Sequence, residues 1–149
     1  MNHVADILNP QPFTVGADGP LRKVIDIALE RHIRSLPVTD AAGRYLGVVS
    51  LHALLALLLP QAARVEHGLA DLAFMAPTVE ELREVVRGTG SERVRDHMDE
   101  GVAPVHPETS ILEAALLMHR TRENLPVVDR ETGRLVGLMS PWEILKRLV

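Results

Sequence analysis

The stretch SLPVTDAAGRYLGVVS, residues 35–50, is repeated farther along the chain as NLPVVDRETGRLVGLMS, residues 124–140. Both copies contain Leu-Pro-Val, then Asp, then Gly-Arg, then Gly, and finally Ser. Each copy predicts an apolar strand, a turn that ends at Gly43 or Gly133, and a second strand that pairs with the first. A hairpin that occurs twice predicts a duplicated fold.

The similarity extends outward from the hairpins. Sliding the chain on itself also aligns VADIL (4–8) with VRDHM (94–98), and PLRKVIDIALERH (20–32) with SILEAALLMHRTR (110–122). The second pair has apolar residues three and four positions apart, which predicts a helix before each hairpin. Ser110 and Glu113 have the spacing of a capping box. Short extended segments at Thr14-Val15 and Val105 precede these helices, and further helices are expected at 51–59 and 141–149.

The repeating unit is therefore β-α-β-β-α, which predicts an α+β fold with repeats at 1–59 and 94–149. Residues 60–93 form an insert, in which an amphipathic helix at 78–87 is expected to close at Gly88. A unit with one apolar sheet face cannot bury that face alone. We therefore expect the two repeats to pack sheet to sheet about a pseudo-twofold axis.

The composition excludes several classes of function. A net charge of −4 and an aromatic content of 3% argue against nucleic-acid binding. The apolar segment 51–60 is too short to cross a membrane, and no secretory signal is evident, so we expect a cytoplasmic protein without a membrane partner. The chain has no cysteine, and its seven histidines lack metal-site spacing, so no metal is expected. No catalytic motif is present, which predicts a protein that is not an enzyme.

The repeated motif resembles a tandem pair of cystathionine β-synthase (CBS) domains, also called a Bateman module. The resemblance covers residues 4–59 and 94–149. It implies a regulatory fold whose clefts, in many members, bind adenosine compounds such as AMP, ADP, ATP or S-adenosylmethionine. Members also commonly form disk-like dimers through their helices. Because a fold does not fix a function, the site residues must decide what this chain binds.

In the family, the last strand enters its helix through Gly-x-x-Ser/Thr-x-x-Asp, where the hydroxyl favours phosphate and the Asp holds the ribose. The second repeat supplies Ser140 and Glu143 at these positions, whereas the first supplies Ser50 and Ala53. Ser140, Pro141 and Glu143 also have the pattern of a helix N-cap. Capping alone and capping combined with ligand binding both remain open interpretations.

The resemblance places basic residues just before the Leu-Pro-Val strand of the repeat that supplies the Gly-x-x-Ser segment. Arg34 would then serve the Ser50 cleft, while Glu123 would leave the Ser140 cleft without a nearby base. A net acidic cleft favours uncharged or cationic adenosine compounds. The purine base would lie against Phe13 and Ile33, although Phe13 is also a candidate core residue. Trp142 is expected to be packed or interfacial.

The helix at 51–59 is apolar on nearly every face, which predicts a covering partner. We expect a homodimer through this helix, with Leu21, Val24 and Ile25 contributing; the alternative is packing against the insert helix. The predicted function is a regulatory module that binds an adenosine-type ligand and acts on an unidentified partner protein. The alternative is a dimerisation scaffold that binds no ligand.

Overall fold

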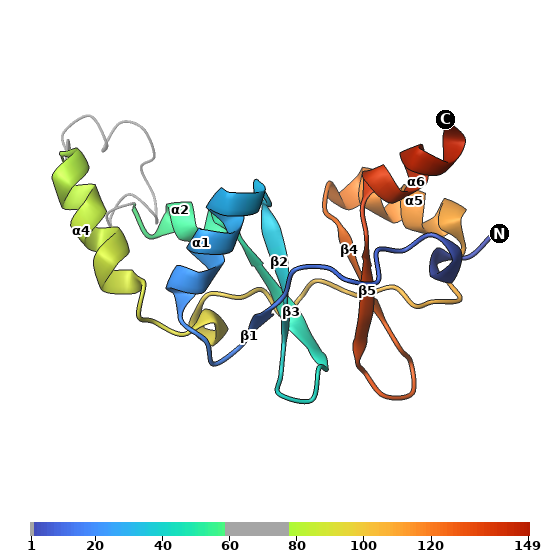
Figure 1. Cartoon of the computed structure of the whole chain (residues 1–149), viewed down its shortest axis with the longest axis horizontal. Coiled ribbons are helices and arrows are strands. Elements are labelled where there is room, and N and C mark those ends of the chain that lie inside the picture. The colour runs from blue at the N-terminus through green and yellow to red at the C-terminus, as the bar shows by residue number, and fades with distance from the viewer. Residues whose placement is uncertain (1, 59–77) are drawn as a thin grey trace.

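The computed structural model describes residues 2–58 and 78–149, which form two units side by side along the long axis of the molecule (Figure 1). The first unit contains β1 (Val15–Gly16), α1 (Leu21–Arg31), β2 (Ser35–Thr39), β3 (Tyr45–Ser50) and α2 (Leu51–Ala56). The second contains α5 (Ile111–Thr121), β4 (Leu125–Val128), β5 (Leu135–Met139) and α6 (Pro141–Leu148). Val105 replaces β1 in the second unit, as an isolated parallel bridge to Val127. The predicted α+β repeat is therefore confirmed.

Both hairpins are held by the same turn chemistry. Gly43 and Gly133 have φ angles of 83° and 74°, in the left-handed region that favours glycine. One carboxylate oxygen of Asp40 accepts the backbone N–H groups of Ala42 and Arg44, each at 2.9 Å. These hydrogen bonds, the one from Arg44 first, lower the pKa of Asp40 from its ordinary value. The aspartate and the first glycine of the repeated motif are thus turn residues rather than ligand-binding residues.

The opening segment of the chain packs on the second repeat, not on its own. It contains the 3-10 helix η1 (Val4–Asp6), in which the Val4 N–H donates to the Thr109 carbonyl at 2.8 Å. Farther along, Asn9 and Leu138 exchange two backbone hydrogen bonds of 2.9 Å each. We call this opening segment, from η1 to Asn9, the crossing segment. It packs on the second repeat, and the residues after it form the first repeat.

The matching crossing segment of the second repeat, residues 94–99, packs on the first repeat in the same way. The 3-10 helix η3 (Val94–Asp96) lies against the start of α1, and the Val94 N–H donates to the Gly19 carbonyl at 3.0 Å. Asp99 and Val48 exchange backbone hydrogen bonds of 2.7 and 3.0 Å. This exchange of opening segments explains why VADIL and VRDHM belong to the repeat.

The bridges between the units reveal an approximate twofold symmetry. The same shift along the sequence converts His3–Ser110 into Pro20–Arg93 and Asn9–Leu138 into Val48–Asp99, while Arg44–Arg134 maps onto itself. The bridge between Arg44 and Arg134 therefore lies on the axis, where the two hairpins meet. Figure 1 shows these hairpins with their turns at the same end of the molecule and the helices at the opposite end.

Each unit has its own apolar core, completed by the crossing segment of the other. Val4 and Ile7 are buried with Ala114, Met118 and Met139 in the second unit. In the first unit, Val94 is buried in the same cluster as Val15, Leu21, Val24, Leu36, Val38 and Val49. The prediction that Leu21 and Val24 contribute to a dimer surface is therefore wrong, because both side chains are buried in the core of the first unit.

The final helix of the first repeat is shorter than expected within the described residues. The predicted helix at 51–59 corresponds to α2, which ends at Ala56. Leu54 and Leu57 pack on the core of the first unit, whereas Leu55 remains 57% exposed. Leu59 and the insert from 60 to 77, including His67, lie outside the described residues.

The insert helix is α4 (Val79–Thr89), at the far edge of the molecule in Figure 1. Its N-cap Thr78 accepts the Glu81 N–H at 3.2 Å. The predicted stop at Gly88 is wrong: the helix continues to Thr89 and is capped by Gly90, whose N–H donates to the Val86 carbonyl. A glycine inside a helix weakens it without ending it. None of the residues of α4 is buried, so α4 provides no core cover for α2.

Candidate functional site

A cleft of 410 Å³ lies between the two repeats and contains five of the six ligand-binding candidates. Those five residues are Phe13, Ile33, Arg34, Ser140 and Glu143. The remaining wall is formed by Asn9, Pro12, Arg31, His32, Ser35, Leu36, Glu123, Asn124, Leu138, Pro141 and Trp142. Ser50 is not among the lining residues. The cleft therefore combines the junction between β5 and α6 with the end of α1 and the segment that leads into β1.

A left-handed residue directs the end of α1 into the cleft. His32 is the C-cap of α1 and has φ 54°, and residues 31–34 all line the cavity. The second repeat ends its matching helix α5 in the same way, because Arg122 has φ 62°. Neither residue is glycine, so both carry some of the strain that an L-residue meets in this region. Residues with this strain are often found at binding sites.

Ser140 does not cap α6 with its side chain, which corrects the capping interpretation. Its hydroxyl makes no capping hydrogen bond; the Glu143 N–H donates instead to the backbone carbonyl of Ser140, at 3.1 Å. Pro141, the first residue of the helix, has no N–H to offer. Ser140 is 9% exposed and lines the cleft, and its hydroxyl is not engaged in the helix cap.

Ser50, the equivalent residue in the first repeat, is used differently. Its hydroxyl accepts the Ala53 N–H at 3.3 Å and therefore caps α2. With its hydroxyl engaged and Ala53 in place of a carboxylate, this junction lacks both groups that Ser140 and Glu143 provide. The two repeats thus differ at this junction in hydrogen bonding as well as in sequence.

Glu143 is the better shielded of the two carboxylates that line the cleft. Its side chain is 17% exposed and lies 3.8 Å from the Lys146 ammonium, measured between Oε2 and Nζ. An ion pair of this length at a partly exposed position contributes little stability. It offsets part of the charge of Glu143 and leaves the carboxylate able to accept hydrogen bonds from hydroxyl groups in the cleft.

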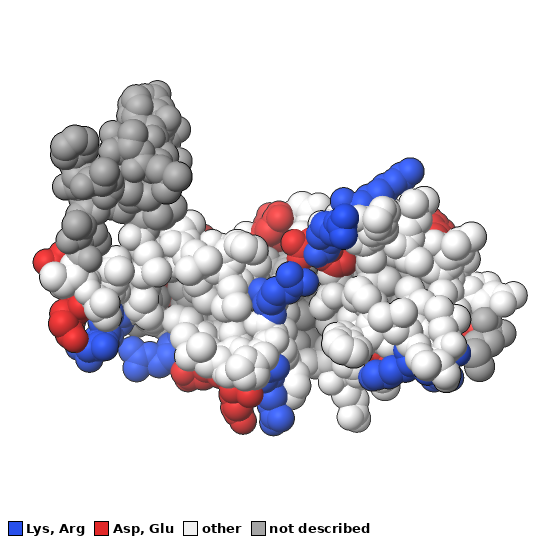
Figure 2. Space-filling model, turned by 90° about the horizontal axis from the view of Figure 1, so that it is seen from above, with Lys and Arg blue, Asp and Glu red and all other residues white. Residues whose placement is uncertain are grey.

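Arg34 lies in the Ser140 cleft, which corrects its assignment to the Ser50 cleft. Together with Arg31 it faces a wall that also contains Glu123 and Glu143. The cleft therefore holds two cations and two carboxylates, and the expectation of a net acidic site is wrong. Among the described residues, no carboxylate lies within 4.0 Å of Arg34, so its guanidinium forms no direct ion pair. Figure 2 shows basic and acidic side chains gathered over the middle of the molecule, where the two repeats meet.

The aromatic residues of the cleft are exposed, not packed in a core. Phe13 is 45% exposed and Trp142 is 70% exposed. The Arg31 guanidinium carbon lies 5.0 Å from the centroid of the Phe13 ring, which is within the range of a cation–π interaction. The alternative that Phe13 is a core residue is therefore wrong, and Trp142 is packed inside neither repeat.

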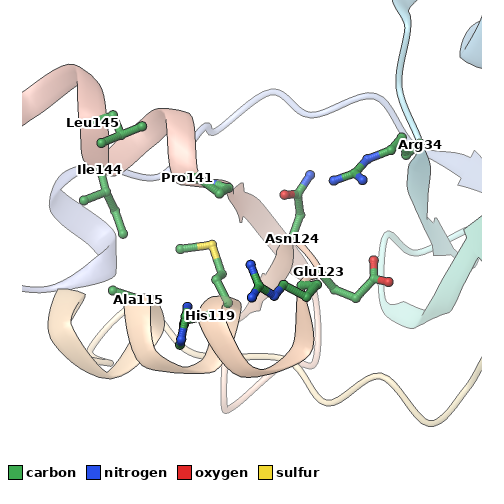
Figure 3. A pocket seen from close by; sticks show the side chains of 10 residues that line it. Arg34, Ala115, His119, Glu123, Asn124, Pro141, Ile144 and Leu145 are labelled. Carbon is green, nitrogen blue, oxygen red and sulfur yellow. The ribbon is translucent and has the colours of Figure 1, made fainter.

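A second cavity of 520 Å³ adjoins the cleft between α5 and α6. The two cavities share Arg34, Glu123, Asn124 and Pro141. Figure 3 shows Ile144 and Leu145 of α6 across from Ala115 of α5, with Arg34 reaching in from the first repeat. Although this cavity is larger, it lacks the serine and carboxylate pair. Ser140 and Glu143 both lie in the smaller cleft.

Several lining residues were missed by sequence reasoning. Asn9 reaches the cleft because the opening segment crosses to the second repeat, and Arg31 reaches it through the turn at His32. The crossing left a signal in the match between VADIL and VRDHM, although a match alone does not indicate which unit the segment packs against. The position of Arg31 at the end of a helix gave no signal.

Within residues 2–58 and 78–149, no group of three or more histidine, aspartate or glutamate side chains could hold a metal ion. None of the helices in these ranges has the length and apolar character needed to span a bilayer.

Comparisons with known proteins agree with the fold and the repeat. The CBS domain model matches residues 4–60 and 94–149. The chain is 28% identical over 161 residues to the uncharacterized protein MJ1426 of Methanocaldococcus jannaschii, covering 98% of this chain and 90% of that protein. It is also 26% identical over 148 residues to the chloroplastic CBS domain-containing protein CBSX2 of Arabidopsis thaliana. That match covers 96% of this chain but only 62% of CBSX2, less than two thirds of that relative.

Solved structures of CBSX2 are similar over nearly the whole chain. The CBS-pair structure of CBSX2 has a TM-score of 0.77 and 25% identity, covering 99% of this chain and 94% of that one. CBSX2 in complex with AMP has a TM-score of 0.72, also with 25% identity, covering 99% and 96%. The CBS pair is not itself a catalytic unit, and the Arabidopsis relative is named for its CBS domains, which agrees with the prediction of a chain that is not an enzyme. Since the family model accounts for both repeats, the chain belongs to the CBS domain family as a tandem pair.

Proposed function

We propose that the cleft between the repeats binds an adenosine-type ligand and that the chain is a regulatory module. The observation that carries this proposal is the meeting of Phe13, Ile33, Arg34, Ser140 and Glu143 in one cavity of 410 Å³. These residues come from three separate segments of the chain. Their types match the three parts of a nucleotide, namely an apolar base, a ribose with two hydroxyls, and a phosphate.

Each part of such a ligand has a partner in the cleft. The Glu143 carboxylate can accept hydrogen bonds from both ribose hydroxyls. The Ser140 hydroxyl has no capping role, so it can donate to a phosphate oxygen, and the Arg34 guanidinium can pair with the phosphate charge. Phe13 and Ile33 offer apolar surface to the base.

The balance of charge in the cleft favours a small phosphate load. The formal charges of the two arginines and two glutamates cancel, so a monophosphate can pair with the arginines, whereas Glu123 would repel the larger charge of a long polyphosphate. The solved complex of CBSX2 with AMP supports this choice, because CBSX2 is 25% identical to this chain over nearly its full length. AMP is therefore the first ligand to test, followed by ADP, ATP, adenosine and S-adenosylmethionine.

Calorimetric titration of the purified protein, freed of carried-over nucleotide, tests the proposal. Saturable binding of a member of this panel is expected in the wild type. Glu143→Ala should lower the affinity about 10-fold or more, because the ribose hydroxyls lose a charged acceptor. Its free energy of unfolding should change little, since the contact with Lys146 is a weak pair.

Glu131→Ala is the matched control, because Glu131 is an exposed carboxylate in the turn of the second hairpin, outside the cleft. The control should bind like the wild type. Heat-silent titrations with every member of the panel would overturn the proposal and favour the scaffold function. Equal affinity in Glu143→Ala and the wild type would remove Glu143 from the site.

A homodimer that acts on a partner protein is the second part of the proposal. Exposed apolar side chains on the helices support it: Leu55 on α2, Leu112 and Leu116 on α5, and Trp142, Leu145 and Leu148 on α6. Large exposed apolar side chains of this kind favour association. The same surfaces would serve a scaffold that binds no ligand.

Sedimentation velocity of the Leu55→Asp variant tests the predicted use of α2. We expect the variant to sediment as a monomer and the wild type as a dimer, because a buried unpaired carboxylate opposes association. The exposed Leu29→Asp change on α1 is a control for an added charge on a neighbouring helix. An unchanged dimer in Leu55→Asp would move the interface to α5 and α6.

A further inference from the structure

The Arg31 guanidinium and the Phe13 ring form a pair inside the cleft. The guanidinium carbon lies 5.0 Å from the ring centroid, and both residues line the cavity. The other contact of Arg31 is with Glu30, 3.8 Å away, and both side chains of that pair are more than half exposed. An exposed ion pair of that length contributes little. The contact with the Phe13 ring is therefore the interaction that draws Arg31 over the cleft.

The chain geometry lets the Arg31 side chain move while its backbone stays fixed. Arg31 is the last residue of α1, and the left-handed turn at His32 is held by an N–H donated to the Ala28 carbonyl. The Arg31 side chain is 53% exposed, so its long stem has room to swing. Phe13 is 45% exposed, and the guanidinium covers part of that ring.

We propose that Arg31 is an anion-dependent gate over Phe13, which makes the cleft selective for a planar base joined to an anionic group. This inference rests on the proposed function and names the class of ligand. In the empty cleft the guanidinium covers the ring. A base that stacks on Phe13 displaces the guanidinium, and a phosphate on the same ligand then receives it.

The energetic consequence differs between charged and uncharged ligands. A nucleoside without phosphate removes the contact between Arg31 and Phe13 and returns nothing, which corresponds to a penalty of about 2- to 5-fold in affinity for a partly exposed cation–π pair. A nucleoside monophosphate gains a charge-assisted hydrogen bond, which corresponds to about 10-fold or more. Because both ligands displace the guanidinium and lose the same contact, the penalty cancels, and wild-type protein should bind AMP at least about 10-fold more tightly than adenosine.

Removing the gate should shift the two affinities in opposite directions. In Arg31→Ala we expect adenosine to bind about 2- to 5-fold more tightly than in the wild type, because it no longer displaces a guanidinium. AMP should bind about 2- to 5-fold more weakly, because the lost phosphate contact of about 10-fold outweighs the same relief. A residue that only supports the fold would weaken both ligands together. Lys23→Ala is the matched control, because Lys23 is an exposed cation on the same helix that does not line the cleft. The control should leave both affinities within about 2-fold of the wild type.

A spectroscopic measurement reports the gate directly. In the free protein, the Nε–H proton of Arg31 should resonate upfield because it lies over an aromatic face, and Phe13→Leu should abolish that shift. Saturating AMP should move the resonance downfield as the guanidinium leaves the ring for the phosphate. These measurements require the folded chain, its Phe13→Leu variant and AMP.

The outcomes separate the gate from the proposed function. Opposite shifts in Arg31→Ala, together with the movement of the resonance, support the gate. Parallel or absent shifts in a protein that binds AMP would overturn the gate and leave the ligand site standing. Wild-type protein that binds neither AMP nor adenosine would overturn both.

Discussion

Replacing Gly137 with alanine should separate the structural role of the repeated Gly-x-x-Ser motif from its binding role. A Cβ atom at Gly137 would lie 2.5 Å from the Asn9 carbonyl oxygen and 2.6 Å from Cδ1 of Leu8. The leucine end can rotate away, but the Asn9 carbonyl belongs to the crossing segment and accepts the Leu138 N–H, while the Asn9 N–H donates to the Leu138 carbonyl. The backbone must therefore move.

We expect Gly137→Ala to lower the free energy of unfolding by about 1–3 kcal/mol, as overpacking does in well-packed regions. For a chain of this length, the melting temperature should fall by about 2–4 °C for each kcal/mol. Urea unfolding gives the free energy, and amide exchange at Asn9 and Leu138 shows whether the crossing segment has loosened. Faster exchange at both amides is expected, since each donates to the other residue.

Gly88→Ala is the matched control for the conformational entropy of the unfolded chain. No atom lies within 4 Å of a Cβ built at Gly88, which is inside α4. This change should raise the stability by about 0.5–1 kcal/mol, because alanine is the better helix former. A Gly137→Ala protein within about 0.5 kcal/mol of the wild type, with unchanged amide exchange, would refute the assignment of this glycine to the chain crossing.

Two further changes follow from the hydrogen bonds of the repeats. Ser50→Ala should cost about 1 kcal/mol because it removes a helix cap, whereas Ser140→Ala should cost less in stability and lower AMP affinity instead; urea unfolding and calorimetry measure the two effects. Equal stability losses in the two variants would contradict the difference in capping. Tyr45 donates to the Val102 carbonyl at 2.7 Å, and burial raises the pKa of Tyr45 to about 12. The raised pKa makes a stabilising contribution that is complete below pH 10 and is lost as the pH rises toward 12, by about 1–2 kcal/mol after allowance for partial exposure. Tyr45→Phe should remove that loss, and a similar decline in both proteins between pH 10 and 12 would contradict the role of Tyr45.

The fold could be predicted because its signals are local and occur twice. Gly43 and Gly133 each terminate a turn, and Leu-Pro-Val begins a buried strand in both copies. The apolar spacing of the two helices before the hairpins also matched the buried positions. Such features depend on neighbours within a few residues, so sequence patterns contain them.

The errors came from features that depend on distant parts of the chain. Leu21 and Val24 were assigned to a surface because the sequence does not show that Val94 arrives from the other repeat to complete their core. Arg34 was assigned to the wrong cleft for a related reason: the end of α1 turns at His32 toward the second repeat. When a segment of one repeat packs on the other repeat, a single sequence contains only a weak pattern of that contact.

The prediction that the Ser140 side chain caps α6 was wrong for a local reason. Serine, proline and glutamate in this spacing are typical of a helix start, and Ser140 does occupy the N-cap position. The Glu143 N–H, however, is taken by the backbone carbonyl of Ser140 rather than by its hydroxyl. Residue type therefore predicted the position correctly and the hydrogen bond incorrectly.

The duplication explains how one site can become specialised while the fold is kept. Because each crossing segment completes the core of the other unit, both copies must retain their apolar positions and their close-packed glycines, Gly47 and Gly137. Val49 and Met139, two residues after these glycines, are also buried, whereas Ser50 and Ser140 at the ends of the strands belong to neither apolar cluster. One repeat can then use its serine to cap a helix, as Ser50 does, while the other leaves Ser140 and Glu143 to the cleft. Among the described residues, Ser140 and Glu143 therefore equip one cleft, and the proposed ligand is expected to bind with a stoichiometry of one per chain.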